Sequence, residues 1–114
     1  MGDEATQTPI GAPGEIAVIF VSRRAACDAE GYAAAAAAMD ALAAAQPGYR
    51  GVHSARDAGG DGITVSYWAD EATALAWRNH PEHRRIRDAG RERWYDSYDV
   101  AVARIERAYR WSAR

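Results

Sequence analysis

The stretch "PGYRGVHSARDAGGDGITVSYW", residues 47–68, decides the fold. Its last part, "ITVSYW", is rich in β-branched and aromatic residues and alternates between two faces, which is typical of a strand. The alternation places Ile63, Val65 and Tyr67 on one face and Thr64, Ser66 and Trp68 on the other. The preceding "AGGDG" tolerates positive φ and predicts a tight reversal. Residues 47–57 are therefore the partner strand of a β-hairpin in the middle of the chain.

The segment before the hairpin predicts one strand and one helix. Residues 15–23, "EIAVIFVSR", are apolar on both faces, which indicates a strand that is covered on both sides. Residues 28–46 are mostly alanine, and Tyr32, Met39 and Leu42 recur at helical spacing on one stripe. They predict a stable helix with a thin, smooth face that can lie close against a sheet.

The segment after the hairpin predicts a helix in two parts and a last strand. Asp70 is placed as the N-cap of the first part. Pro81 fits the first turn of a second part, so we expect the helix to break or kink at residues 79–81 and to run to about Arg93. Residues 97–111 are the expected fourth strand.

The order β-α-β-β-α-β is the split βαβ, ferredoxin-like pattern of an α+β fold. It predicts a four-stranded antiparallel sheet with the helices on one face. We expect one domain at residues 15–112 that follows a flexible leader at residues 1–14. A chain of 114 residues leaves nothing to cover the other face of the sheet, so we expect a homodimer through that face.

Composition excludes several classes of function. The formal net charge is -2, so the chain lacks the basic excess that nucleic acids and anionic membranes require. The lone cysteine, Cys27, rules out an intrachain disulfide and a multi-thiolate metal centre. No apolar run approaches the roughly eighteen residues of a membrane span, and the N-terminus lacks a signal-peptide pattern. We expect a cytoplasmic protein without nucleic-acid or membrane partners.

The reactive side chains gather in "AWRNHPEHRRIRDAGRERWY", residues 76–95. His83 shares a helical stripe with Ile86 and Trp94, so it faces a cavity if Ile86 does. An imidazole at such a place can be a general base, an axial heme ligand, an orienting donor or a hydrogen-bonded core histidine. The residues alone leave these roles open.

His80 and Arg87 are further polar candidates on this segment. His80 and His83 stand three residues apart, but Pro81 interrupts the turn between them and no carboxylate completes a metal site. We therefore expect no metal and assign His80 to a cap or a loop. Arg87 follows His83 by one helical turn and can pair with a phenolate or a ligand carboxylate. Its alternative is an exposed arginine bonded to Asp88.

The stretch "SYWADEATALAWRNHPEHRRIRDAGRERWYDSYDVAVARIERAY" resembles the antibiotic biosynthesis monooxygenase family, whose members are small dimeric α/β-barrel proteins. The match extends from about Ile16 to Tyr109. The residues that carry it are Tyr67, Trp68, Glu71, Trp77, His83, Gly90, Arg91, Tyr98, Arg107 and Tyr109. The family includes quinone-forming oxygenases, heme-degrading enzymes and members without a defined activity.

The resemblance implies a cofactor-independent monooxygenase that uses dioxygen on a bulky aromatic or polyketide-like metabolite. Such chemistry needs an apolar cavity, a base or oxyanion stabiliser and the exclusion of water, and it requires no metal. In this interpretation His83 assists deprotonation. The catalytic candidates are His83, Trp77 and Arg87, and the substrate-binding candidates are Phe20, Tyr67, Trp68, Trp94 and Tyr95.

Two alternatives stay open beside the cofactor-independent oxygenase. Heme-degrading relatives use an asparagine on the first strand, a tryptophan at the second helix and a histidine ten residues later. Trp77 matches the tryptophan, but Arg87 stands at the histidine position and residues 19–20 at the asparagine position are Ile and Phe. A heme with His83 or His80 as axial ligand is therefore one alternative. The other is a non-catalytic dimeric ligand-binding protein in which the aromatic cluster is dry core.

Overall fold

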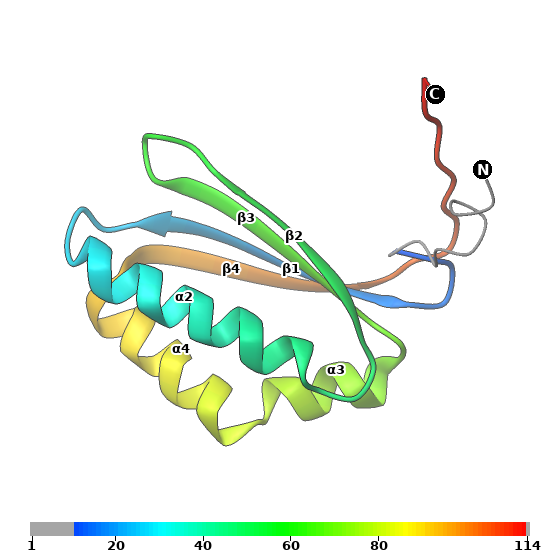
Figure 1. The fold of residues 1–114 in the computed structure, drawn as a ribbon, viewed down its shortest axis with the longest axis horizontal. Coiled ribbons are helices and arrows are strands. Elements are labelled where there is room, and N and C mark those ends of the chain that lie inside the picture. The colour runs from blue at the N-terminus through cyan, green and yellow to red at the C-terminus, as the bar shows by residue number, and fades with distance from the viewer. Residues whose placement is uncertain (1–10, 114) are drawn as a thin grey trace.

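The computed structural model describes residues 11–113, which form an open sheet with helices on one side (Figure 1). The strands are β1 (Ile16–Arg24), β2 (Tyr49–Arg56), β3 (Asp61–Trp68) and β4 (Tyr95–Arg104). The helices are α2 (Ala29–Ala44), α3 (Glu71–Arg78) and α4 (Pro81–Arg93). The predicted ferredoxin-like order is confirmed, with the second helix divided into α3 and α4.

The four strands are antiparallel neighbours in the order β2-β3-β1-β4. Their register assigns each side chain to a face. Phe20 lies opposite Thr64 of β3 and Val100 of β4, and these three side chains face the helices. The next residue, Val21, lies opposite Ile63 and faces away from the helices. The predicted alternation along β3 is confirmed.

All three helices cover the same face of the sheet, as predicted (Figure 1). The other face, here called the open face, has no layer over it among residues 11–113. Val21 and Ile63 lie side by side on the open face and are 42% and 50% exposed. No helix in the described part of the chain is long and apolar enough to cross a membrane.

The hydrophobic core is concentrated at the α3 end of the molecule. Trp68 of β3 and Ile16 of β1 are almost completely buried, and Trp77 of α3 packs above them. The rings of Trp68 and Trp77 are stacked with centroids 5.8 Å apart. At the opposite end, the buried Trp94 donates a hydrogen bond from Nε1 to Asp28 at 3.0 Å and joins α4 to the start of α2. Trp77 thus holds α3 against the sheet at one end of the molecule, and Trp94 holds α4 against the start of α2 at the other.

Local side-chain contacts explain where α3 and α4 begin. Asp70 caps α3, because its carboxylate accepts a hydrogen bond from the backbone N–H of Thr73 at 2.8 Å. His80 caps α4 in the same way through Nδ1, which accepts from the backbone N–H of Glu82 at 3.1 Å. Pro81 is the first residue of α4. The predicted N-cap and the predicted break at residues 79–81 are both confirmed.

The last strand is shorter than predicted. We expected it to span residues 97–111, but β4 ends at Arg104. The reason lies in its neighbour β1, which begins at Ile16 and offers no further strand to pair with. Ile105 still exchanges backbone hydrogen bonds with Glu15 and Gly14, and the chain then leaves the sheet.

Most of the predicted leader, residues 1–10, lies outside the residues that the structure describes. Its last four residues form a turn in front of β1. The backbone N–H groups of Gly11 and Ala12 donate to the buried carboxylate of Glu15 at 2.9 and 3.1 Å. The start of β1 is thereby fixed by a side chain as well as by the sheet.

Gly48, which precedes β2, provides a test of the packing between the start of β2 and the cap of α3. Its φ is +82°, and a Cβ at this position would lie 2.4 Å from the Thr73 side chain that completes the α3 cap. Gly14 has a similar φ of +91° with open space around it. We expect Gly14→Ala to lower the free energy of unfolding by about 1–2 kcal/mol through backbone strain alone, and Gly48→Ala to lower it by about 2–4 kcal/mol. Urea unfolding measures both, and equal losses would contradict the described contact with Thr73.

Candidate functional site

A cavity of about 950 Å³ lies between the sheet and the helices. This volume is at the upper end of the range for small-molecule sites and suits a ligand of several fused rings. Val18 and Phe20 of β1 form part of its floor. Beside β4 the cavity reaches the surface, where Val100 and Val102 are 53% and 62% exposed although they face the helices.

The alanine-rich helix α2 creates much of this space. The lining residues of α2 include Ala35, Ala36, Met39 and Ala43, which fall on the stripe that its sequence predicts. An alanine side chain is a single methyl group, so a helix that presents alanines leaves room where leucines would fill the core. The composition of α2 thus explains why a cavity remains between two packed layers.

His83 lies on the wall of the cavity that α4 provides. Its ring is stacked flat on Trp77, with centroids 4.4 Å and planes 3° apart. Its Nδ1 is 2.9 Å from the backbone carbonyl of Trp77. A carbonyl oxygen only accepts, so Nδ1 carries the hydrogen and donates it. With Nδ1 used in this way, Nε2 is the nitrogen left to accept a hydrogen bond or a proton, on a ring that lines the cavity.

The surroundings of His83 favour its neutral form. Burial lowers the pKa of His83, and the positive charge of Arg87 lowers it further. Hydrogen bonds to the backbone of Trp77 and Arg78 act in the opposite direction but do not offset the burial. At neutral pH the imidazole is therefore uncharged and able to accept a proton through Nε2.

Arg87 lies one helical turn after His83 on the same wall. Its side chain is 27% exposed, and its Nε is buried with no hydrogen-bond partner among the described residues. The carboxylate of Asp88 is 3.7 Å away, too far for a hydrogen bond. Arg91, by contrast, donates from Nε to the hydroxyl of Tyr98. A buried charged donor without a hydrogen-bond acceptor is costly, and an oxygen atom of a ligand in the cavity would satisfy it.

The opposite part of the cavity is lined by aromatic rings. Phe20 of β1 contacts Tyr95 and Tyr98 with centroids 5.4 and 5.1 Å away. Burial and a hydrogen bond with Tyr32 raise the pKa of Tyr95. Its hydroxyl stays protonated at neutral pH, so this end offers flat apolar surfaces with uncharged hydroxyl groups.

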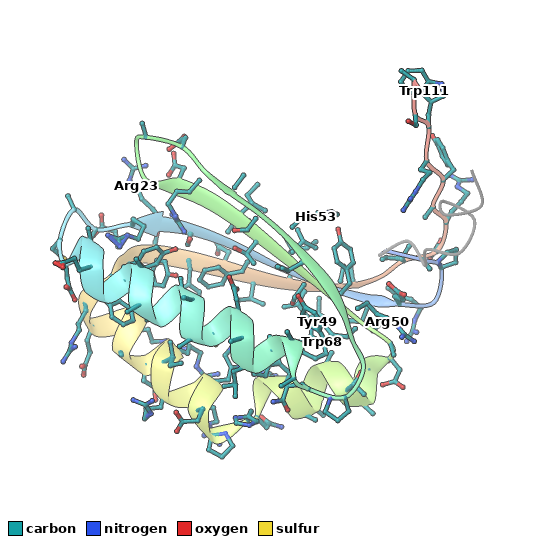
Figure 2. The ribbon with its side chains drawn as sticks, viewed as in Figure 1. Arg23, Tyr49, Arg50, His53, Trp68 and Trp111 are labelled. Atoms are coloured by element: carbon teal, nitrogen blue, oxygen red, sulfur yellow. The ribbon has the colours of Figure 1, made fainter. Side chains whose placement is uncertain are left out.

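Six of the eight candidates from the sequence line the cavity: His83, Trp77, Arg87, Phe20, Trp94 and Tyr95. The structure places Tyr67 elsewhere, because it lies on the open face with its hydroxyl 3.1 Å from Nδ1 of His53. Trp68 faces the helices but is completely buried beneath Trp77, so it is core rather than wall. Figure 2 shows Trp68 and His53 on opposite sides of the hairpin. Consecutive residues of a strand point to opposite faces, so Tyr67 and Trp68 could not both have faced the ligand.

Several lining residues were not among the candidates. They include Tyr32 and Met39 of α2 and Tyr98 of β4. The helical stripe of α2 and the alternation of β4 indicated their faces in advance, but neither pattern showed that the space in front of them is empty. Within the described part of the chain, no three histidine, cysteine, aspartate or glutamate side chains gather as a metal site would require.

Solved structures share this fold. The structure of SnoaB, a cofactor-independent oxygenase from Streptomyces nogalater, superposes with a TM-score of 0.69 at 14% identity, over 88% of this chain and 97% of that one. Rv0793 from Mycobacterium tuberculosis superposes with a TM-score of 0.69 at 20% identity, over 88% of this chain and 99% of that one. At such identities the likeness shows a common fold and leaves the activity open.

Sequence comparison gives a more specific relationship. The chain is 46% identical over 107 residues to YqjZ, an uncharacterized protein of Bacillus subtilis, and the match spans 94% of this chain and 91% of that one. The model of the family described as antibiotic biosynthesis monooxygenase matches residues 16–89, which is more than half of the chain and includes β1 through most of α4. The chain belongs to the antibiotic biosynthesis monooxygenase family.

Proposed function

We propose that the protein is a cofactor-independent monooxygenase that oxidises a bulky aromatic or polyketide-like phenol with dioxygen. The observation that carries the proposal is the pair of unused polar groups on one turn of α4, the free Nε2 of His83 and the unpartnered Nε of Arg87. Both belong to residues that line a large, mostly apolar cavity. SnoaB, which has the same fold, is described as a cofactor-independent oxygenase, and this supports the same class of chemistry here.

The first step is deprotonation of the substrate. His83 accepts a proton from a phenol or an activated C–H group through Nε2, because its neutral form predominates at neutral pH. The resulting anion lies beside the guanidinium of Arg87, whose free donor stabilises the developing negative charge. Trp77 acts as a positioning residue, since its carbonyl and its ring hold the imidazole from two directions.

The second step is oxygenation of the electron-rich anion. The carbanion form attacks dioxygen, a C–O bond forms, and the peroxide takes up a proton from the His83 imidazolium. Loss of water from the carbon that carries the hydroperoxide then leaves a carbonyl group. A CH₂ group and O₂ become C=O and H₂O, so one oxygen atom enters the product and the substrate supplies all four electrons. The protein contributes binding, a base and a fixed positive charge.

The same free nitrogen supports one alternative, a heme-binding protein. Nε2 of His83 would ligate the iron, and Arg87 would pair with a propionate. A bound heme would supply oxygen activation, and His83 and Arg87 would hold it. A dedicated binding protein without catalysis would use the same cavity for an unreacted ligand.

We further propose that the protein is a homodimer in which two copies meet through their open faces. Val21 and Ile63 are adjacent on this face and are 42% and 50% exposed, and an apolar sheet face of this kind is normally covered. We also propose a cytoplasmic location, because Cys27 is an exposed free thiol, which a reducing compartment preserves.

The tautomers of two histidines test the proposed base. His83 should carry its hydrogen on Nδ1, because that atom donates to a carbonyl. His80 should carry it on Nε2, because its Nδ1 accepts from a backbone N–H, and it serves as the internal control. Long-range ¹H–¹⁵N NMR correlations at pH 7.5 distinguish the two forms. A hydrogen on Nε2 of His83 would contradict the proposed mechanism.

The pH dependence follows from the lowered pKa of His83. Its ordinary value is about 6.5, so in the folded protein protonation occurs only below that pH. The unfolded chain binds the proton first as the pH falls, so the contribution to stability is complete above about 6.5 and is lost below it. We expect His83→Gln to show a smaller loss of stability between pH 7 and pH 5 than the wild type, as measured by urea unfolding. An identical loss in both proteins would contradict the lowered pKa.

Dioxygen consumption with anthrone-like phenols tests the activity. We expect the wild type to consume one O₂ per substrate, and His83→Gln to lower kcat/KM by about 10²–10⁴-fold because the base is lost. Arg87→Met should lower it by about 10²-fold through loss of the positive charge. Arg84→Met removes an exposed arginine from the same helix and should leave the rate unchanged. An oxygen electrode and product absorbance follow the reaction.

The outcomes separate the alternatives. Phenol binding without O₂ consumption would favour the non-catalytic binding protein. A Soret band after addition of hemin that disappears in His83→Ala would favour the heme-binding protein. If neither phenols nor hemin bind, the cavity is not the functional site that we propose.

A charged residue on the open face should disrupt the homodimer. We expect Ile63→Asp to produce a folded monomer, because burial of a carboxylate in an apolar interface is costly. Leu75→Asp introduces the same charge at a residue of α3 that is 53% exposed, close to the 50% of Ile63, and should leave the dimer intact. Sedimentation velocity measures both variants. A dimer of unchanged affinity in Ile63→Asp would place the interface elsewhere.

A further inference from the structure

The end of the cavity away from His83 carries a second group of polar side chains. Tyr32 of α2 and Tyr95 of β4 line the cavity there. The start of α2 and the end of α4 lie at this end of the molecule, whereas α3 lies at the other (Figure 1). An α-helix rises about 1.5 Å per residue, so the part of α4 between His83 and Arg93 is about 15 Å long. The two polar ends of the cavity are therefore well separated.

Arg56 of β2 reaches across the sheet to Tyr32. It lies over Gly62 of β3, where a Cβ would be 2.5 Å from the guanidinium carbon. Its Nη2 donates to the hydroxyl of the buried Ser22 of β1 at 2.7 Å and to the hydroxyl of Tyr32 at 3.3 Å. The missing side chain of Gly62 thus provides the space in which one guanidinium connects β2, β1 and α2.

A second arginine lies on the ring of Tyr32. The guanidinium carbon of Arg24 is 3.9 Å from the ring centroid, and its Nη1 is buried with no hydrogen-bond partner among residues 11–113. Within the same residues, neither Arg24 nor Arg56 forms an ion pair with a carboxylate. Asp28 interacts with the charge of Arg24, but its two oxygens already accept hydrogen bonds from Trp94 and from a backbone N–H of α2. Two positive charges therefore lie against one tyrosine of the cavity wall without a paired negative charge.

The hydroxyl of Tyr32 keeps a hydrogen that these contacts do not use. Its oxygen accepts the hydrogen bond from Arg56. It also accepts from Tyr95, because the hydrogen bond between the two hydroxyls raises the pKa of Tyr95 and so favours Tyr95 as the donor. A hydroxyl oxygen can accept two hydrogen bonds and still donate one. The O–H of Tyr32 is therefore able to donate to a ligand in the cavity.

We infer that Tyr32, Tyr95, Arg24 and Arg56 form a subsite for a carboxylate of the substrate, an inference that rests on the proposed function. The hydroxyl of Tyr32 donates to a carboxylate oxygen, and the two arginines supply positive charge behind it. Hydrogen bonds to ionised acceptors are about twice as strong as those between neutral groups. The arginines contact Tyr32 and are not among the residues that line the cavity, so they act as positioning residues.

The two ends of the cavity together define a class of substrate. A ligand that occupies both carries an acid group at one end and the reacting phenol at the other, with apolar rings between them. A single-ring phenol is too short to reach across about 15 Å, whereas several fused rings with an acid substituent approach that length. Binding of the acid at the subsite would hold the phenol beside His83, and such positioning accelerates a reaction. The substrate is thus a polycyclic aromatic carboxylic acid.

A matched pair of ligands tests the subsite. A dihydroxyanthraquinone carboxylic acid and its primary amide have the same rings and differ by one negative charge at neutral pH. Both are already quinones and do not react with dioxygen, so isothermal titration calorimetry measures binding without catalysis. We expect the wild type to bind the acid about 10-fold or more tightly than the amide, as charge-assisted hydrogen bonds predict.

Variants locate the group that recognises the acid. Arg56→Met and Arg24→Met should each lower the preference for the acid over the amide by about 3-fold or more, because each removes one positive charge. Tyr32→Phe removes only the donor and should weaken binding of the acid by about 10-fold, which keeps the test decisive if Arg56→Met does not fold. Arg23→Met removes the same charge from a side chain that is 53% exposed on the open face, and it should leave the preference unchanged.

The other outcomes overturn the inference and show what remains. If the wild type binds the acid and the amide equally, the subsite is wrong but the cavity still binds aromatic ligands. A preference that survives Arg24→Met and Arg56→Met but disappears in Arg87→Met would place the carboxylate on the wall formed by α4. If neither quinone binds, the subsite fails, and the proposed function fails with it only when the wild type also consumes no dioxygen with an uncharged dihydroxyanthrone.

Discussion

The stack of three rings formed by Trp68, Trp77 and His83 is the contact on which the rest of the site depends. Trp68 is fixed in the sheet, Trp77 packs on it at 5.8 Å, and His83 lies on Trp77 at 4.4 Å. One end of the stack is hydrophobic core and the other is the wall of the cavity. The sheet therefore determines the position of a titratable group that lies two helices further along the chain.

The break between α3 and α4 makes this arrangement possible. A continuous helix would carry His83 onward along the same axis, whereas the cap at His80 and the proline that follows let α4 start in a new direction. Nδ1 of His83 can then reach the Trp77 carbonyl near the end of α3. The break thus determines which nitrogen of His83 faces the helix end, and so links helix capping to the acid–base chemistry that we propose.

The elements of the fold could be predicted from local sequence. The hairpin at residues 47–68, the cap at Asp70 and the break near Pro81 depend on neighbours in the chain, and their patterns were sufficient. The alternation of β3 also predicted that Tyr67 and Trp68 lie on opposite faces of the sheet, although both were named as substrate-binding candidates. The end of β4 depended on where β1 begins and therefore required the pairing of distant segments.

The site could be predicted only in part. His83 and Arg87 were named from their spacing on one helix face, but the cavity is a space between layers and no local pattern describes it. The donor of Arg87 that lacks a hydrogen-bond acceptor could likewise be found only from the structure, because the sequence also allows a hydrogen bond to Asp88, whose carboxylate lies too far away at 3.7 Å. The hydrogen bond that leaves Nε2 of His83 free joins two helices, and its geometry arises from packing.

The most direct test of the central claim is a crystal structure of the protein with a dihydroxyanthrone, prepared without oxygen so that the ligand does not react. The ring system should lie between α2 and the sheet, with one oxygen about 2.6–3.2 Å from Nε2 of His83 and another within reach of Arg87. A ligand bound outside the cavity, or bound inside it with its oxygens away from His83, would contradict the role assigned to this histidine.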